Sequence, residues 1–436
     1  MPEELDISLA PELLDEGSPE ERAAFGLFTI RSRHSSLTEG FDFYLNNYRP
    51  GPLVSGYHAA EWFAWNWWRL RWEPRSAAHD WALAHQMTSI GEGYVWPNVT
   101  IFSDGVRTAL ISSPSSRPDA KPFRYIGALP LILPSTVFEA AIDAFIPRVL
   151  GRLREQDVPE TNLDRLWCDV LAERADPDIA KRRRLEALLG RDPDAVGDNA
   201  VEQLLADVGL LGEQSLYEIA AEAARGTAVL TAKEFKQIAQ EHGHDAEPQD
   251  VVRLHADHRV ARGPELPAWR IGADAARALR EQEGLGAGAI TNSVLARMAG
   301  TREATLGVTQ TGRPPFSFVL DQNARKARIV LRSPWPTGQR FDLARLIGDQ
   351  LISTDGALHP ATRAYTYRQK AQRSFAAEFL SPFEAVDEML AGDYSTERQQ
   401  EVAESFDVSP MTIDTLLKNH GKIEREGSDF EFVTGS

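Results

Sequence analysis

The chain has 436 residues, a formal net charge of −17, 42% hydrophobic residues and 25% charged residues. This length and composition are typical of a globular protein with two or three domains. The acidic balance excludes bulk attraction to nucleic acid, because a phosphate backbone needs Lys and Arg to replace its counterions. Cys168 is the single cysteine, so no internal disulfide can form, which favours a reducing compartment.

No segment predicts export or insertion into a membrane. Residues 1–6 are acidic, where a signal peptide is basic and then apolar. The most apolar window, residues 125–150, is interrupted by prolines and acidic residues, whereas a membrane span needs roughly 20 apolar residues in succession. We therefore expect a cytoplasmic protein that has no membrane partner.

Residues 1–150 predict a small α+β domain of unknown role. Residues 25–30 alternate as a strand. Residues 99–102 and 106–111 form a hairpin pattern, with Asp104-Gly105 at the turn.

Half of the ten tryptophans lie in residues 57–72, which have a helical pattern. Trp65, Trp68 and Trp72 would then stack along one side of the helix at three- and four-residue spacing. The favoured interpretation is a core helix. The alternative is an exposed platform that stacks on bases, and such platforms come with a basic groove.

Residues 151–268 predict a helical middle region. Its basic run, residues 181–184, lies among acidic residues and is interpreted as a solvated face with ion pairs, with a nucleic-acid contact as the alternative. Four histidines lie close together in the sequence, but no Cys or ordered acidic pattern accompanies them as metal ligands. They are His242, His244, His255 and His258.

Two segments near the C-terminal end carry the most specific motif. Residues 340–349 read Arg-Phe-Asp-Leu-Ala-Arg-Leu-Ile-Gly-Asp, and residues 373–382 read Arg-Ser-Phe-Ala-Ala-Glu-Phe-Leu-Ser-Pro. Together they resemble the signature segments of the ImmA/IrrE zinc metallopeptidase family. Those run roughly Arg-Phe-x-Leu-Ala-His-Glu-x-Gly-His and Phe-Ala-x-Glu-Leu-Leu-x-Pro.

The resemblance implies a metallopeptidase-like domain at residues 269–393, with two opening helices, a small sheet and the two signature helices. A helix-turn-helix-like subdomain would follow at residues 394–423, and an acidic tail at residues 424–436. The expected fold class is therefore α+β and mainly helical, with a small N-terminal α+β domain, a helical middle and this C-terminal scaffold.

The resemblance also implies where the chemistry would lie. An active member needs two His four residues apart, a Glu general base beside the first, and an acidic third zinc ligand. Arg345, Leu346 and Asp349 stand at the first His, the Glu and the second His, and the third-ligand position near Ala371 has no carboxylate. Arg is a permanent cation that repels zinc. We therefore expect no catalytic residue, no bound metal and no cofactor.

Three interpretations of the altered pocket stay open. Arg345 and Asp349, at i and i+4, would form an ion pair that fills it. A rebuilt metal site would use Asp349, His359 and Glu378. An anion pocket for a phosphate or nucleotide would use five cations, Arg345, Arg363, Arg368, Lys370 and Arg373.

The helix-turn-helix pattern begins with a capping box at Thr396 and places Ser409 as the cap of its second helix. A DNA contact would use Thr412, Thr415 and Lys418. No Arg is present there to read guanine edges, so a structural role is favoured.

The favoured function is that of a catalytically inactive ImmA/IrrE-like pseudo-peptidase that binds a protein partner. Because family members cleave repressors, the resemblance implies regulation in a stress, phage or mobile-element response, by analogy alone. One alternative is an active hydrolase, with a rebuilt metal site or with chemistry in the N-terminal domain. The other is a DNA-binding transcriptional regulator that uses the helix-turn-helix.

Overall fold

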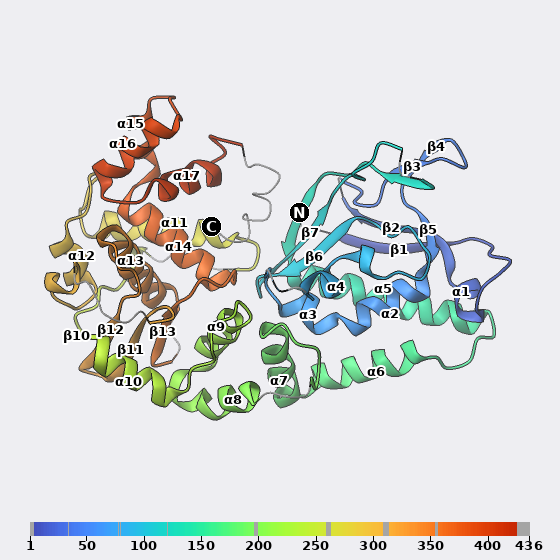
Figure 1. Cartoon of the computed structure of the whole chain (residues 1–436), viewed down its shortest axis with the longest axis horizontal. Helices are drawn as coiled ribbons and strands as arrows, with labels where there is room; N and C mark the ends of the chain where they lie inside the picture. Colours follow the sequence, from blue (N-terminus) through green and yellow to red (C-terminus); the bar gives the residue numbers. More distant parts are fainter. Residues whose placement is uncertain are drawn as a thin grey trace. The chain divides into compact units, whose positions relative to one another are not determined.

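The chain folds into two units, Met1–Gly197 and Asp198–Ser436, and each is α+β with antiparallel sheets (Figure 1). A computed structural model describes residues 4–33, 35–76, 78, 80–119, 121–195, 199–258, 263–307, 314–353 and 356–424. Within these ranges, no helix is long and apolar enough to cross a membrane. The predicted acidic tail lies outside the described residues, apart from Glu424.

The described residues of unit 1 form three small sheets with strand orders β1-β2-β5, β4-β3-β8 and β6-β7-β9. Its strands are β1 (Leu5–Pro11), β2 (Phe25–Ser32), β3 (Gly40–Asp42), β4 (Asn47–Arg49), β5 (Leu53–Ser55), β6 (Val99–Ser103), β7 (Arg107–Ser112), β8 (Phe123–Tyr125) and β9 (Pro130–Pro134). Its helices are α1 (Pro19–Ala23), α2 (Gly56–Trp65), α3 (Trp67–Trp72), α4 (Trp81–His85), α5 (Ser135–Glu155), α6 (Asn162–Ala175) and α7 (Pro177–Leu188). The strands at β2 and at the β6–β7 hairpin confirm the predicted ones.

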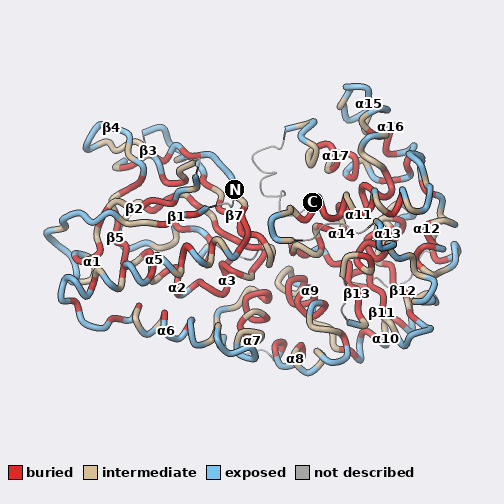
Figure 2. Tube along the Cα trace, turned by 180° about the vertical axis from the view of Figure 1, so that it is seen from behind, coloured by how far each residue is buried: buried red, intermediate tan, exposed pale blue. Residues whose placement is uncertain are grey.

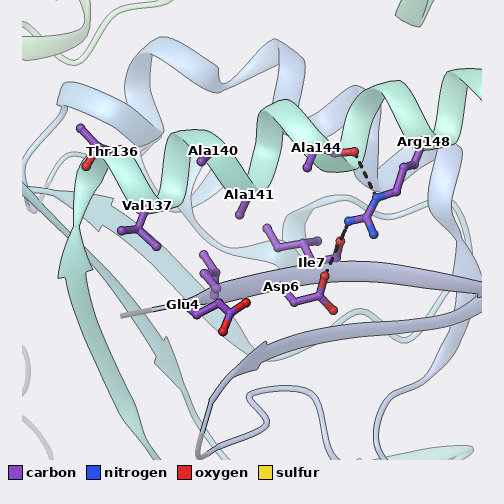
Figure 3. A pocket seen from close by; sticks show the side chains of 10 residues that line it. Glu4, Asp6, Ile7, Thr136, Val137, Ala140, Ala141, Ala144 and Arg148 are labelled. Atoms are coloured by element: carbon purple, nitrogen blue, oxygen red, sulfur yellow. Dashed lines mark hydrogen bonds and ion pairs between the residues drawn. The ribbon is translucent and has the colours of Figure 1, made fainter. Parts of the chain in front are cut away.

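Helix α5 lies along β1 and closes one side of the unit 1 core. Phe145 on α5 packs edge-on against Phe28 of β2, with ring centroids 5.8 Å apart, and against Phe63 of α2 at 6.0 Å. Between α5 and β1, the Nη2 atom of Arg148 donates to the carbonyl of Ile7. This hydrogen bond lies beside a groove between α5 and β1 that is lined in part by alanines of α5 (Figure 3).

The tryptophan-rich run packs in the core, as predicted, but the predicted stack of Trp65, Trp68 and Trp72 is wrong. The helix is interrupted at Asn66, whose side-chain amide donates to the carbonyl of Trp62 at 2.9 Å. The interruption leaves Trp65 60% exposed and turns Trp68 into the core. Because a side-chain amide competes with the helical backbone for hydrogen bonds, Asn is a natural breaking point.

A buried charge cluster fixes the end of α3 against α4. Glu73 is fully buried and accepts from the Nε atom of Arg69 at 2.7 Å and from the Nε2 atom of His85 at 2.9 Å. The His85 ring stacks on Trp81, with centroids 4.2 Å apart. The Glu73 carboxylate thus accepts hydrogen bonds from both the buried guanidinium of Arg69 and the buried imidazole of His85.

Unit 2 contains one four-stranded sheet with the order β10-β12-β11-β13. Its strands are β10 (His244–Ala246), β11 (Ser317–Asn323), β12 (Lys326–Val330) and β13 (Leu358–Ala361). Its helices are α8 (Ala200–Leu211), α9 (Glu213–Ala223), α10 (Ala232–His242), α11 (Ala268–Gln282), α12 (Asn292–Met298), α13 (Pro336–Ile352), α14 (Tyr367–Leu380), α15 (Phe383–Leu390), α16 (Thr396–Phe406) and α17 (Pro410–Asn419).

Small residues let α11 and α13 approach α14 closely. A Cβ atom on Gly272 of α11 would lie 2.2 Å from the carbonyl oxygen of Ala371, and one on Gly348 of α13 would lie 2.6 Å from the ring of Phe375. Neither distance is possible for real atoms, so both glycines are required by the packing. The close approach excludes water from the facing surfaces of α13 and α14.

The two units divide the chain differently from the predicted domains. The predicted helical middle, residues 151–268, is shared between them. Trp167 of α6 belongs to the core of unit 1, whereas Phe235 of α10 packs on Phe318 of β11 in unit 2. Phe406 of α16 joins the same core as α13 and α14, so residues 269–393 and 394–423 lie in one unit.

We predict that replacing Glu73 with Ala lowers the free energy of unfolding by about 3–5 kcal/mol. The buried Arg69 would keep only the more exposed Asp80 and Asp192 as counter-charges, and the Nε2 atom of His85 would lose its acceptor. The matched control is E155A, because Glu155 is exposed and pairs with Arg152 across a single turn. Loss of this exposed ion pair should change the free energy of unfolding by less than about 1 kcal/mol. Urea-induced unfolding measures both, and equal effects of E73A and E155A would contradict the assignment.

Candidate functional site

Arg345 and Asp349, which stand at the positions of the two zinc-binding histidines in the resemblance, lie one turn apart on α13, and both are buried. Helix α14 supplies Arg368, Gln369 and Gln372 opposite them. We call these residues, together with His359 of β13 and Glu218 and Glu222 of α9, the α13–α14 charge network.

Asp349 has no exposed surface and accepts four hydrogen bonds. Arg368 donates its Nε atom to Oδ1 at 2.7 Å and its Nη2 atom to Oδ2 at 2.6 Å. The Nε2 atom of Gln372 donates to Oδ1 at 2.7 Å, and the Nδ1 atom of His359 lies 3.1 Å from Oδ2. Burial raises the pKa of Asp349, but the paired Arg368 outweighs burial and holds this pKa well below its usual value. Asp349 is therefore an ionised carboxylate at neutral pH.

Arg345 points toward the loop between β13 and α14. Its Nη2 atom donates to the carbonyl of Thr362 at 2.5 Å and to the Oε1 atom of Gln369 at 2.6 Å. The predicted Arg345–Asp349 ion pair is wrong, because Arg368 binds the Asp349 carboxylate in a bidentate ion pair instead. Burial lowers the pKa of Arg345, and its Nε atom has no acceptor.

The side chains at the positions of the general base and of the third zinc ligand are apolar and belong to the core. Leu346 and Ala371 are each 1% exposed, and Ala371 lies against Gly272. Neither side chain can take a proton from water or hold a metal.

The rebuilt metal site does not assemble. His359 contacts Asp349, but Glu378 turns to Arg277, whose Nε atom lies 3.0 Å from Oε1. No group of three or more His, Cys, Asp or Glu in the described ranges is arranged to hold a metal ion, and this includes the described histidines between residues 242 and 258.

The predicted anion pocket is only partly present. Arg368 is held by Asp349, and Arg363 donates its backbone N–H and its Nε atom to Glu222 at 2.8 and 3.1 Å. Lys370 is half-buried on α14. Arg373 donates to the carbonyl of Ala364 at 3.0 Å. Two of the five cations are therefore committed to carboxylates.

Sequence reasoning missed the acidic residues of α9. Glu222 has no exposed surface, and Glu218 accepts from the hydroxyl of Thr366, the cap of α14, at 2.6 Å. Burial raises the pKa of Glu218. The sequence did contain a signal, because Glu218 and Glu222 are four residues apart on the helical face that also carries Ser215 and Ile219. If that face is buried, both carboxylates need hydrogen-bond or ion-pair partners.

The helix-turn-helix pattern corresponds to two packed helices, α16 and α17, and the three residues of the alternative DNA contact lie on α17. Thr412 is buried, and its hydroxyl lies 3.0 Å from that of Ser409. Lys418 pairs with Asp414 at 3.0 Å, and Thr415 is half-buried. The predicted cap at Thr396 is shifted by one residue, because the side chain of Ser395 accepts from the backbone of Arg398.

We compared the chain with models of protein families, with curated proteins and with solved structures, and nothing matched. The interpretation of the network therefore depends on the geometry given above.

The opposite pKa shifts of Asp349 and Glu218 predict opposite effects of removing their charges. The pKa of Asp349 is lowered in the fold, so its stabilisation is present above the unfolded pKa and is lost as the pH falls through the folded pKa. At neutral pH, D349N should therefore lower the free energy of unfolding by about 3–5 kcal/mol, since Arg368 keeps its burial without its counter-charge.

The pKa of Glu218 is raised, so its stabilising form is the protonated one. That stabilisation is present below the ordinary value of 4.5 and is lost as the pH rises through the folded pKa. E218Q keeps the shape without the charge, so at neutral pH it should leave stability within about 1 kcal/mol or raise it. Urea unfolding of both variants at neutral pH and at pH 4.5 is the measurement. A loss with E218Q as large as that with D349N would refute the assignment.

Proposed function

We propose that this chain is a non-catalytic pseudo-peptidase, in which an ImmA/IrrE-like core serves as a framework and the protein acts by binding a protein partner. The observation that carries the proposal is the α13–α14 charge network. At the two positions that would hold zinc in a peptidase of this type, Asp349 is paired with Arg368, and Arg345 donates to oxygens of Thr362 and Gln369. The positions of the general base and of the third ligand carry the buried Leu346 and Ala371.

The chemistry of these side chains supports a structural role of the network more than a catalytic role. Asp349 has all its strong acceptor positions occupied, and Arg345 donates to fixed oxygens. A general base needs a free lone pair that faces the substrate, and a Lewis acid needs an open coordination position. The network offers neither at Asp349 or Arg345.

The β3–β4 hairpin of unit 1 supplies a surface for a partner. Tyr44 is 87% exposed, and Leu45 and Tyr48 are each 62% exposed. Figure 2 shows the connection between β3 and β4 as exposed. The ring of Tyr48 packs edge-on against Phe41, which lies opposite it across the two strands. Clustered large apolar side chains with tyrosines among them are typical of protein interfaces. We call Tyr44, Leu45 and Tyr48 the hairpin tip.

The biological setting follows from the resemblance alone. Members of the family act on repressors in stress and mobile-element responses, so a regulatory role in such a response is the setting we propose. A DNA-binding regulator is less well supported, because Thr412 is buried and Lys418 is paired.

The proposal predicts that a photo-crosslinking amino acid at position 44 captures one defined protein in extracts of the source cells. The same amino acid at position 171 is the control, because Leu171 is also an exposed apolar residue of unit 1. The variant Y48D should abolish the crosslink at position 44 and leave the melting temperature unchanged. An identical set of crosslinked proteins at both positions would overturn the hairpin tip as the binding surface.

A further inference from the structure

Three arginines of unit 2 share an unusual feature. The Nε atoms of Arg225, Arg345 and Arg373 are buried and have no hydrogen-bond acceptor. Buried N–H groups in folded proteins are nearly always paired, and an exception calls for an ion or a water molecule at that point. For a charged donor the cost of remaining unpaired is larger still.

Two of the three guanidinium groups lie beside the ring of Tyr365, and the charge of the third, Arg345, acts on Arg373. The Cζ atom of Arg225 lies 4.6 Å from the ring centroid of Tyr365, and that of Arg373 lies 5.9 Å from it. Burial, and after it the nearby charge of Arg345, lower the pKa of Arg373 to about 9. The like charges are therefore close enough to repel one another.

The carboxylates of the network leave these cations incompletely compensated. Asp349 is held by Arg368, and Glu222 by Arg363. Glu218 accepts from the hydroxyl of Thr366, and burial raises its pKa. Asp342 acts on Arg345 through its charge, but its carboxylate accepts from the hydroxyl of Ser317. A local excess of buried positive charge is notable in a chain whose net charge is −17.

We propose that Arg225, Arg345 and Arg373 form a binding site for an oxyanion of the phosphate class. Such an anion presents several acceptor oxygens at once and matches the planar donor fork of guanidinium. Free phosphate and the phosphate group of a nucleotide both carry this chemistry. The site shares Arg345 and Arg373 with the pocket expected from the sequence, and Arg225 replaces the committed Arg363 and Arg368.

Local structure fixes Arg225 and gives a route to it. The residue follows the end of α9, where its N–H donates to the carbonyl of Glu222, and Gly226 takes a positive φ of 91° to turn the chain. Arg225 and Tyr365 are half-buried, whereas Arg345 is buried. An anion would therefore approach past Arg225 and Tyr365. The site is independent of the proposed partner-binding function.

The test is calorimetric titration of the full chain with inorganic phosphate and, separately, with a nucleoside triphosphate, at constant ionic strength set by sodium chloride. Saturable binding is expected, and R225Q should weaken it by about tenfold or more because one of three charge-assisted contacts is lost. The matched control is R398Q, since Arg398 on α16 pairs with Glu401 at the surface and its loss changes the charge equally. R398Q should bind as the native chain does.

Each outcome decides the proposal. Binding of both ligands shows that the phosphate group suffices, and binding of the nucleotide alone shows that the rest of the nucleotide contributes. R373Q provides a second variant in case R225Q alters the turn after α9. The absence of saturable binding with either ligand, or equal affinity in R225Q, R373Q and the native chain, would overturn the site.

Discussion

A carboxylate that is fully removed from water must be matched by positive charge, and Asp349 imposes this requirement on unit 2. The requirement arises from packing. Gly348 and Gly272 bring their helices against α14 so closely that Asp349 retains no exposed surface. Arg368 supplies the charge, and Gln372 and His359 complete the contacts of the carboxylate. The positions of α13, α14 and β13 are therefore coupled through one side chain.

The same constraint explains the composition of the surrounding residues. Arg345 is buried next to Asp349, and its partners are neutral oxygens of Thr362 and Gln369. Positive charge is thus distributed over more groups than the carboxylates compensate, and α9 contributes Glu222 to Arg363. The positive charge that has no paired carboxylate lies around Tyr365. The proposed framework role and the proposed anion site would both follow from this one distribution of charge.

Local patterns predicted much of the fold. The strand at β2 and the Asp104-Gly105 hairpin follow from periodicity and turn chemistry. The helices of the two signature segments were expected from the resemblance, and these segments lie in α13 and α14. Asn66 and Ser395 were missed because a single side-chain hydrogen bond decides where a helix ends or begins, and several nearby residues compete for that role.

The partners in the charge network could not be predicted in the same way. Two arginines of the predicted anion pocket pair with carboxylates through contacts that a helical spacing rule does not encode, namely Arg368 with Asp349 of another helix and Arg363 with Glu222 of α9. The i, i+4 rule favoured Arg345 as the partner of Asp349, and the tertiary arrangement overrides it. The division into two units at Gly197–Asp198 could not be read from the sequence for a related reason, because helical periodicity shows a buried face but not which core receives it.

The central claim is that paired charges have replaced a metal centre between α13 and α14. The most direct measurement is the zinc content of the purified chain by mass spectrometry, after expression with added zinc and dialysis at neutral pH. The account predicts far less than one zinc ion per chain, with no change in D349N. One zinc ion per chain that survives dialysis and disappears in D349N would contradict it.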